Sequence, residues 1–135
     1  LQVLDVGCGL GFPLIELSMR LGSSSHFYGI DPWHAAIERI RLKIRVCGLS
    51  HVEVIEGYAE QLPFENDYFD LIISNNGLNN VQNFNSALKE CRRVGRNGAR
   101  LFYTFNTEGT FIEFYDVYRI PSITCVPRSF SLKLN

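Results

Sequence analysis

A glycine-rich segment near the start of the chain has the residue types that bind a nucleoside cofactor. The segment from Val3 to Gly11 reads Val-Leu-Asp-Val-Gly-Cys-Gly-Leu-Gly and directly follows the start of an apolar run. Glycine tolerates positive φ angles and lets the backbone approach a ligand closely. The exposed N–H groups of a following helix favour a carboxylate or a phosphate. The segment therefore predicts a ligand-binding loop between a strand and a helix.

Asp31 makes this prediction more specific, because it ends the next apolar run, twenty residues beyond Gly11. A carboxylate there can accept hydrogen bonds from both hydroxyls of a ribose. A dinucleotide fingerprint requires glycine at the sixth position of G-x-G-x-x-G. That position is Phe12, and the pattern is instead D-x-G-x-G-x-G beginning at Asp5. A dinucleotide-dependent oxidoreductase is therefore the less favoured alternative.

Short apolar runs alternate with helical spacing along the chain, which predicts the elements that position these residues. Strands are expected over 1–6, 27–30, 52–55, 69–74 and 100–105, and helices over 14–21, 33–47 and 84–94, with a turn at 95–98. Such alternation is typical of right-handed parallel crossovers. It predicts an α/β fold, a doubly wound, mainly parallel sheet with helices on both faces.

Four of the expected strands end in residues that suit a binding site. Asp5 and the glycines follow the first, Asp31 the second, residues 56–60 the third, and residues 74–76 the fourth. In open α/β sheets, ligands bind beyond the carboxyl ends of the strands. We therefore expect these segments to meet in one crevice.

The chain resembles the class I S-adenosylmethionine-dependent methyltransferases, and within them the small-molecule branch that includes quinone-biosynthesis (type 11) enzymes. The resemblance rests on 3–11 as the first motif, 29–32 at the end of the second strand, 57–64 with 69–74, and 93–98 before the fifth strand. It covers residues 1 to about 105 in order and spacing. It implies a Rossmann-like fold and S-adenosyl-L-methionine as cofactor.

The resemblance also implies roles for individual residues. Gly7, Gly9 and Gly11 would pass under the methionine part of the cofactor, Asp5 would help to hold its amino group, and Asn75 would lie beside the methyl group. The full set of candidate cofactor-binding residues is Asp5, Gly7, Cys8, Gly9, Gly11, Asp31, Pro32, Trp33, Tyr58, Ala59, Glu60 and Asn75.

At the nucleoside end, the resemblance places the ribose on Asp31, one face of the adenine beside Pro32 and Trp33, and its edge at the backbone of Ala59. An alternative for Trp33 is packing on the apolar face of its own helix. Tyr58 departs from the family pattern, which commonly has an aspartate that accepts from the adenine amino group. A phenol oxygen is a weaker acceptor than a carboxylate.

No residue is identified as a catalytic base. His26 and His51 lie next to the starts of strands and are expected to be surface or structural residues. His34 lies near the expected crevice and is the minor candidate. The four cysteines show no CxxC spacing, so no metal site is expected. The segment 75–80 lacks the Asn-Pro-Pro-aromatic signature of base-modifying enzymes. The net charge of −1 also gives no electrostatic reason to expect nucleic acid as a partner. We therefore expect a small-molecule substrate.

The length of 135 residues allows one domain, with a core over 1–105 and a substrate-side or lid segment over 106–135. In that segment, 111–118 suits a helix or an aromatic lid, and 122–126 and 129–134 suit a hairpin. No apolar run reaches the roughly 18 residues of a membrane span. The four scattered cysteines suit reduced thiols in a cytosolic protein, so a cytoplasmic location is expected. The chain opens on an apolar strand without an initiator methionine, which suggests a protein incomplete at both ends.

An uncovered fifth strand would be an exposed apolar edge, so the tail, a longer parent chain or a second subunit is expected to cover it. A homodimer is one of these expectations. Two further hypotheses from different classes stand beside the methyltransferase: a methyltransferase-like binding module without catalysis, and the oxidoreductase.

Overall fold

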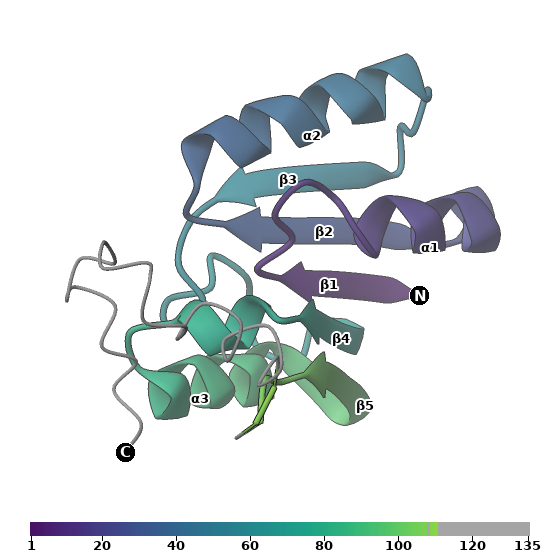
Figure 1. Cartoon of the computed structure of the whole chain (residues 1–135). Helices are drawn as coiled ribbons and strands as arrows, with labels where there is room; N and C mark the ends of the chain where they lie inside the picture. Colours follow the sequence, from purple (N-terminus) through teal and green to yellow (C-terminus); the bar gives the residue numbers. More distant parts are fainter. Residues whose placement is uncertain (108, 111–135) are drawn as a thin grey trace, which may run out of the picture.

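The computed structural model describes residues 1–107, 109 and 110, and the expected segments 111–118, 122–126 and 129–134 lie outside the described residues. Its elements are β1 Gln2–Val6, α1 Leu14–Leu21, β2 His26–Asp31, α2 His34–Val46, β3 Val52–Glu56, β4 Phe69–Asn75, α3 Phe84–Val94 and β5 Gly95–Thr104, with short 3-10 turns at η1 Gly22–Ser24 and η2 Gly77–Asn80. Figure 1 shows these elements along the chain.

The five strands form one sheet in the order β3-β2-β1-β4-β5, and every neighbouring pair is parallel. The order reverses between β1 and β4, where the chain crosses from one half of the sheet to the other. Ligands bind at such a reversal in doubly wound folds. The predicted fold class is confirmed.

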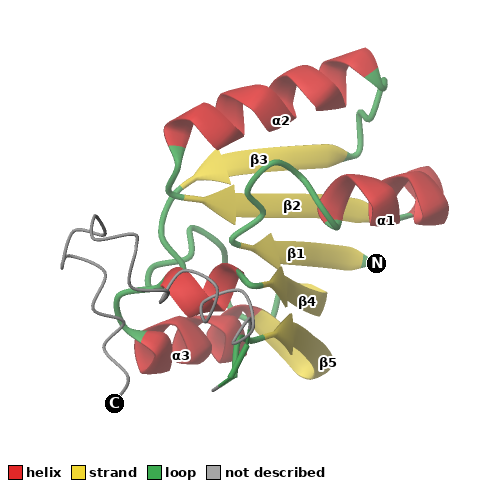
Figure 2. Ribbon diagram, in the orientation of Figure 1, coloured by secondary structure: helices red, strands yellow, loops and turns green. Residues whose placement is uncertain are grey.

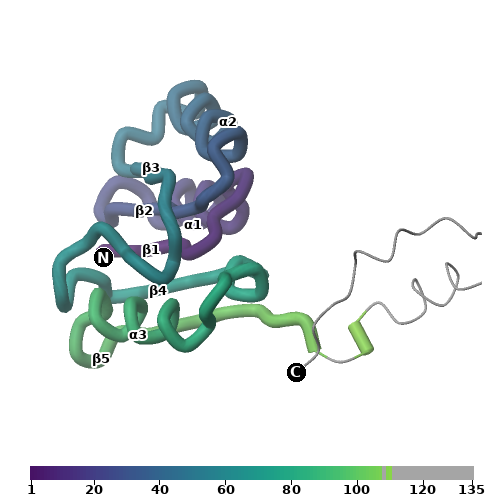
Figure 3. The backbone as a smooth tube through the Cα atoms, turned by 90° about the vertical axis from the view of Figure 1, so that its left-hand side faces the viewer, coloured from purple at the N-terminus to yellow at the C-terminus, as the bar shows by residue number. Residues whose placement is uncertain are grey.

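Helices cover both faces of the sheet (Figure 2). On one face, α1 and α2 bury Leu14, Ile37 and Ile40 in a core with Val3 and Phe27. Side chains of a strand alternate between its faces, so the neighbouring residues of β1 point the other way. On that second face, α3 packs against Leu4, Val6 and Ile72, a layering that can be followed in Figure 3. The sheet is thus buried in the manner of a parallel α/β core.

Local signals explain where the helices begin and end. Asn83 caps α3 by accepting a hydrogen bond from the Ser86 N–H at 2.9 Å, as short polar side chains do at helix starts. The loops after α1 and α2 contain Gly22 and Gly48, both with positive φ. Glycine adopts this conformation without steric cost and ends helices for that reason.

The start of β5 differs from the prediction of a turn over 95–98. Gly95 already pairs with Phe69, and Arg100 then pairs with Leu71, so the residues between them form an irregularity in the register. Gly98, with φ of 84°, lies inside it. Glycine in a strand pattern often marks such a bulge, which the turn signal of Asn97-Gly98 concealed.

Within the part of the chain that the structure describes, no helix has both the length and the apolar character needed to cross a membrane.

Candidate cofactor-binding site

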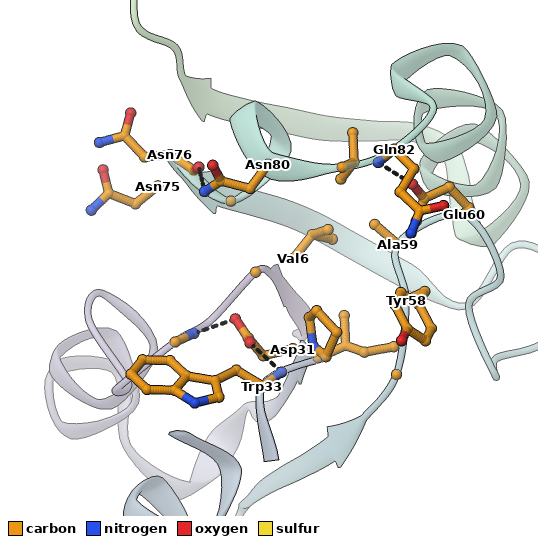
Figure 4. A pocket seen from close by; sticks show the side chains of 17 residues that line it. Val6, Asp31, Trp33, Tyr58, Ala59, Glu60, Asn75, Asn76, Asn80 and Gln82 are labelled. Carbon is orange, nitrogen blue, oxygen red and sulfur yellow. Dashed lines mark hydrogen bonds between the residues drawn. The ribbon is translucent and has the colours of Figure 1, made fainter. Parts of the chain in front are cut away.

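A cavity of about 570 Å³ lies at the carboxyl ends of β1, β2, β3 and β4 (Figure 4). This volume is within the range of small-molecule sites, roughly 300–1,000 Å³. The residues that line it are Val6, Gly7, Gly9, Ile30, Asp31, Pro32, Trp33, Gly57, Tyr58, Ala59, Glu60, Asn75, Asn76, Gly77, Asn80, Val81 and Gln82. Nine of the twelve candidate residues are in this set; Asp5, Cys8 and Gly11 are not.

The glycine loop is held against the end of β2 by its backbone. The N–H groups of Gly7 and Cys8 both donate to the carbonyl of Ile30, at 2.8 and 3.1 Å. Gly7 and Gly9 have positive φ angles of 74° and 48° and line the cavity. No atom lies within 4 Å of the position of a Cβ on Gly9, so a ligand has open space there. The loop thus presents backbone to the cavity.

Gly77, which was not among the candidate residues, holds the loop after β4 close to the glycine loop. A Cβ on Gly7 would lie 2.4 Å from the Gly77 Cα, and a Cβ on Gly77 would lie 2.2 Å from the Val6 carbonyl oxygen. Only two glycines permit so close an approach of these backbones. The dipeptide Asn76-Gly77 is a turn signal that could have identified this position.

Ser74 supports the same contact from within the core. Its buried hydroxyl donates to the Val6 carbonyl at 2.7 Å and accepts from the Leu78 N–H at 3.1 Å. It therefore ties the end of β1 to β4 and to the turn that follows β4.

Asp31 stands between the glycine loop and α2. One carboxylate oxygen accepts from the Gly9 N–H at 2.9 Å, and the other accepts from the Trp33 N–H at 2.9 Å. A carboxylate has about four acceptor positions, so each oxygen keeps one for a ligand. Two vicinal hydroxyls, as in a ribose, match this arrangement.

Aromatic and apolar side chains line the cavity next to Asp31. Trp33 and Tyr58 expose 60% and 59% of their surface, and Pro32 is also exposed. The alternative for Trp33, packing on the face of its own helix, is not supported, because most of the indole is exposed. These residues offer flat surfaces to an aromatic base.

Glu60 lines the cavity, but its carboxylate already holds the loop before α3. One oxygen accepts from the backbone N–H groups of Gln82 and Asn83, at 2.7 and 3.0 Å. Partial burial opposes ionisation, yet these N–H groups hold the pKa of Glu60 below its ordinary value. Glu60 is thus an anionic anchor for the segment that carries Gln82.

Gly11 and Cys8 lie outside the cavity because they serve the packing behind it. A Cβ on Gly11 would lie 2.8 Å from the Ile40 side chain, so this glycine lets the loop approach α2 closely. Cys8 is buried, and its side chain lies beside Gly29 of β2. Burial is also the main reason that the pKa of the Cys8 thiol is raised.

Asp5 is likewise absent from the lining, because it shares the α1 side of β1 with Val3, whereas Val6 faces the cavity. Its side chain is fully buried, and neither carboxyl oxygen has a hydrogen-bond partner among the described residues. Burial raises the pKa of Asp5 to about 7, and the nearby charge of Asp31 adds to this shift. The direct contact with a ligand amino group that was expected for Asp5 is therefore not seen in the geometry.

Amides gather where β4 ends. Thr104 donates to the side-chain oxygen of Asn75 at 2.8 Å and accepts from the Asn76 N–H at 2.9 Å. Asn76 has a left-handed backbone with φ of 58°. Asn75 and Asn80 both line the cavity, on the side of the glycine loop (Figure 4).

His34 does not line the cavity. Its Nδ1 lies 2.7 Å from a carboxylate oxygen of Glu56, and this hydrogen bond raises the pKa of His34. Over residues 1–107, 109 and 110, no three His, Cys, Asp or Glu side chains come together in a way that could hold a metal ion.

Comparison with known proteins identifies the family. The family described as "Methyltransferase domain" matches residues 4–103. A demethylmenaquinone methyltransferase from Anoxybacillus flavithermus is 32% identical over 117 residues, which are 87% of this chain and 49% of that protein. The chain thus spans about half the length of the curated relatives that it matches.

Solved structures share the fold of this chain. A SAM-dependent methyltransferase from Aquifex aeolicus is 29% identical with a TM-score of 0.66, over 70% of this chain and 50% of that one. The [4+2]-cyclase SpnF is 27% identical with a TM-score of 0.70, over 74% of this chain and 36% of that one. The Rossmann-like fold, the cavity at the strand ends and the matched family together show that this chain belongs to the class I S-adenosylmethionine-dependent methyltransferases.

Proposed function

We propose that the protein binds S-adenosylmethionine in the 570 Å³ cavity and transfers its methyl group to a small-molecule acceptor. The observation that carries the proposal is the convergence of Asp31, the glycine loop and Asn75 on one cavity in a chain of this family. When bound, S-adenosylmethionine supplies an electrophilic methyl group on a sulfonium. The residues of the chain then have to bind the cofactor, orient the acceptor and exclude water.

In this proposal, Asp31 accepts hydrogen bonds from the two ribose hydroxyls through the acceptor positions that the backbone leaves free. Gly7 and Gly9 would lie under the methionine part, and Asn75 would lie beside the methyl group. Asp5, which lies behind the loop, acts from a distance: its buried carboxyl favours positive charge in front of the loop. The orphaned carboxyl fits a cofactor with an ammonium group.

The lining offers few groups that could remove a proton from an acceptor. The titratable side chains among the described lining residues are Asp31, Tyr58 and Glu60. The carboxyl oxygens of Asp31 and Glu60 already accept backbone hydrogen bonds. We therefore propose that the acceptor atom is already nucleophilic when it binds and needs no base. The other source of a base is residues outside 1–107, 109 and 110.

The names of the relatives suggest a class of acceptor. Proteins 31–32% identical to this chain are named demethylmenaquinone methyltransferases, so a ring of the quinone type is the first acceptor to try. A small molecule rather than nucleic acid, a cytoplasmic location and a homodimer remain predictions from the sequence.

Calorimetric titration with S-adenosylmethionine, S-adenosylhomocysteine and NAD tests the proposal. We expect micromolar binding of the first two compounds and none of NAD. A folded protein that binds neither methionine-derived compound would refute it. Release of S-adenosylhomocysteine in the presence of a demethylated quinol would then test the acceptor class.

A second function is a cofactor-binding protein of this fold that transfers no methyl group. The similarity to SpnF, which is named a [4+2]-cyclase, motivates this second function. Tyr58, where the family commonly has an aspartate, does so as well. Binding of S-adenosylhomocysteine without turnover on any acceptor tested would favour this second function.

A further inference from the structure

Gln82 presents a primary amide to the cavity from the loop between η2 and α3. It lines the cavity together with Tyr58 and Ala59, and in Figure 4 its side chain extends toward Ala59. Its backbone N–H donates to Glu60 at 2.7 Å, and that of Asn83 donates to the same oxygen. The amide is thus carried by an anchored piece of backbone.

The order of the strands indicates which part of a nucleoside lies near this amide. Asp31 ends β2, and β2 lies between β1 and β3. The glycine loop and Asn75 follow strands on one side of Asp31, whereas Tyr58 and Ala59 follow β3 on the other. With the ribose on Asp31 and the amino-acid part over the glycines, the base has to lie on the β3 side. This step rests on the proposed function.

The base needs a hydrogen-bonding partner there, and the described residues on that side of the cavity offer few. The edge of adenine presents an amino donor beside a ring-nitrogen acceptor. Glu60 uses one oxygen for two backbone N–H groups, and Tyr58 has a single hydroxyl on a ring that is 59% exposed. A glutamine amide has both a carbonyl acceptor and an amino donor, and it pairs with adenine through two hydrogen bonds in other proteins.

We infer that Gln82 reads the hydrogen-bonding edge of the purine and replaces the carboxylate that this chain lacks at Tyr58. The consequence is a distinctive specificity. A carboxylate only accepts hydrogen bonds, so one that faces the 6-substituent accepts from the amino group of a 6-amino purine but is repelled by the O6 of a 6-oxo purine. An amide can turn over and donate to O6 while it accepts from the N1–H. Gln82 therefore tolerates both the 6-amino and the 6-oxo base.

Calorimetry with S-adenosylhomocysteine and S-inosylhomocysteine, which differ only at this edge, tests the inference. The wild-type protein binds the two compounds with affinities within about threefold of each other. Gln82→Glu favours the 6-amino compound by about tenfold or more, because its carboxylate faces O6. Gln82→Leu weakens both compounds by about tenfold, the effect of losing two hydrogen bonds of ordinary strength.

The matched control is Gln61→Leu, the same change at an exposed neighbour outside the cavity lining, and it leaves both affinities unchanged. Circular dichroism and thermal unfolding establish that each variant is folded. If Gln82→Leu binds S-adenosylhomocysteine as the wild type does, or the wild type rejects the 6-oxo compound, the inference is wrong and the proposed function stands. If the folded wild type binds no S-adenosylhomocysteine, both are wrong.

Discussion

Asp31 is the residue on which the site depends most, because its carboxylate joins the glycine loop to the start of α2. We expect Asp31→Ala to weaken S-adenosylhomocysteine binding by about 1.5–3 kcal/mol, the range for hydrogen bonds to a charged group. Calorimetry measures this change. Asp31→Asn is the control, because it keeps an acceptor for one N–H and should lose less. An unchanged affinity in the alanine variant would show that the ribose lies elsewhere.

Asp5 makes the stability of the unliganded protein depend on pH. Its pKa is about 7 in the folded chain against an ordinary value of 3.8. The unfolded chain therefore releases this proton first, and stability falls as pH rises from about 4 to about 7. At pH 8 the penalty is complete.

Asp5→Asn removes that penalty. We expect the variant to be more stable than the wild type by roughly 2–4 kcal/mol at pH 8. The lower end of this range allows for the cost of burying an amide without hydrogen-bond partners. At pH 4 to 5 most of this gain should be gone. Urea unfolding at both pH values measures the difference, and an equal effect at the two would contradict the placement of the carboxyl.

At the scale of the elements, the cavity depends on the contact between the loops after β1 and β4. In Gly77→Ala the new Cβ would meet the backbone of Val6 and Gly7 within 2.2–2.7 Å. Backbone cannot move aside as a flexible side chain does, so we expect a loss of about 3 kcal/mol in unfolding free energy and weaker cofactor binding.

Gly48→Ala is the control for this prediction. Gly48 has φ of 65° but nothing within 4 Å of its Cβ position. Its substitution should therefore cost only the conformational penalty of about 1–2 kcal/mol and leave the cavity intact. Equal losses in the two variants, measured by urea unfolding, would mean that the interloop contact is not what holds the cavity.

The elements were largely predictable because their signals are local. Apolar runs, helical spacing and the glycines after α1 and α2 each act over a few residues, and all strands and helices of the described part were expected. The start of β5 was not, because pairing of Gly95 with Phe69 depends on a strand 26 residues away. The turn signal of Asn97-Gly98 predicted a loop before the strand instead.

The meeting of residues at one cavity was predictable where the chain places them directly at strand ends, as with Gly7, Asp31 and Asn75. It was not predictable where a tertiary contact decides the role of a residue. Glu60 holds a loop more than 20 residues away, and Gly77 meets Gly7 only in the fold. Gln82 has no signature of its own in the sequence.

At the scale of the whole molecule, β5 is the last strand of the sheet in the described part, and it is rich in exposed aromatic residues. Phe102 and Tyr103 expose 58% and 49% of their surface. Phe102 also lines a second hollow with Phe12 and Pro13. An apolar surface of this kind favours association with another protein surface.

We therefore expect the protein to self-associate through this face, and Phe102→Thr to weaken association by about tenfold or more, because burial of a phenyl ring contributes about 1.5–3 kcal/mol. Sedimentation equilibrium measures the association constant. Val46→Thr, which alters a residue of α2 that is 77% exposed, is the control. A wild-type protein that stays monomeric at all concentrations would contradict this prediction.

The position of Trp33 has a practical consequence for all of these experiments. It is the single tryptophan of the sequence, and it lies at the edge of the cavity with most of its indole in solvent. A ligand that covers the indole displaces water from it and changes its fluorescence. The protein thus carries an intrinsic optical reporter at the cavity, which registers occupancy without any label.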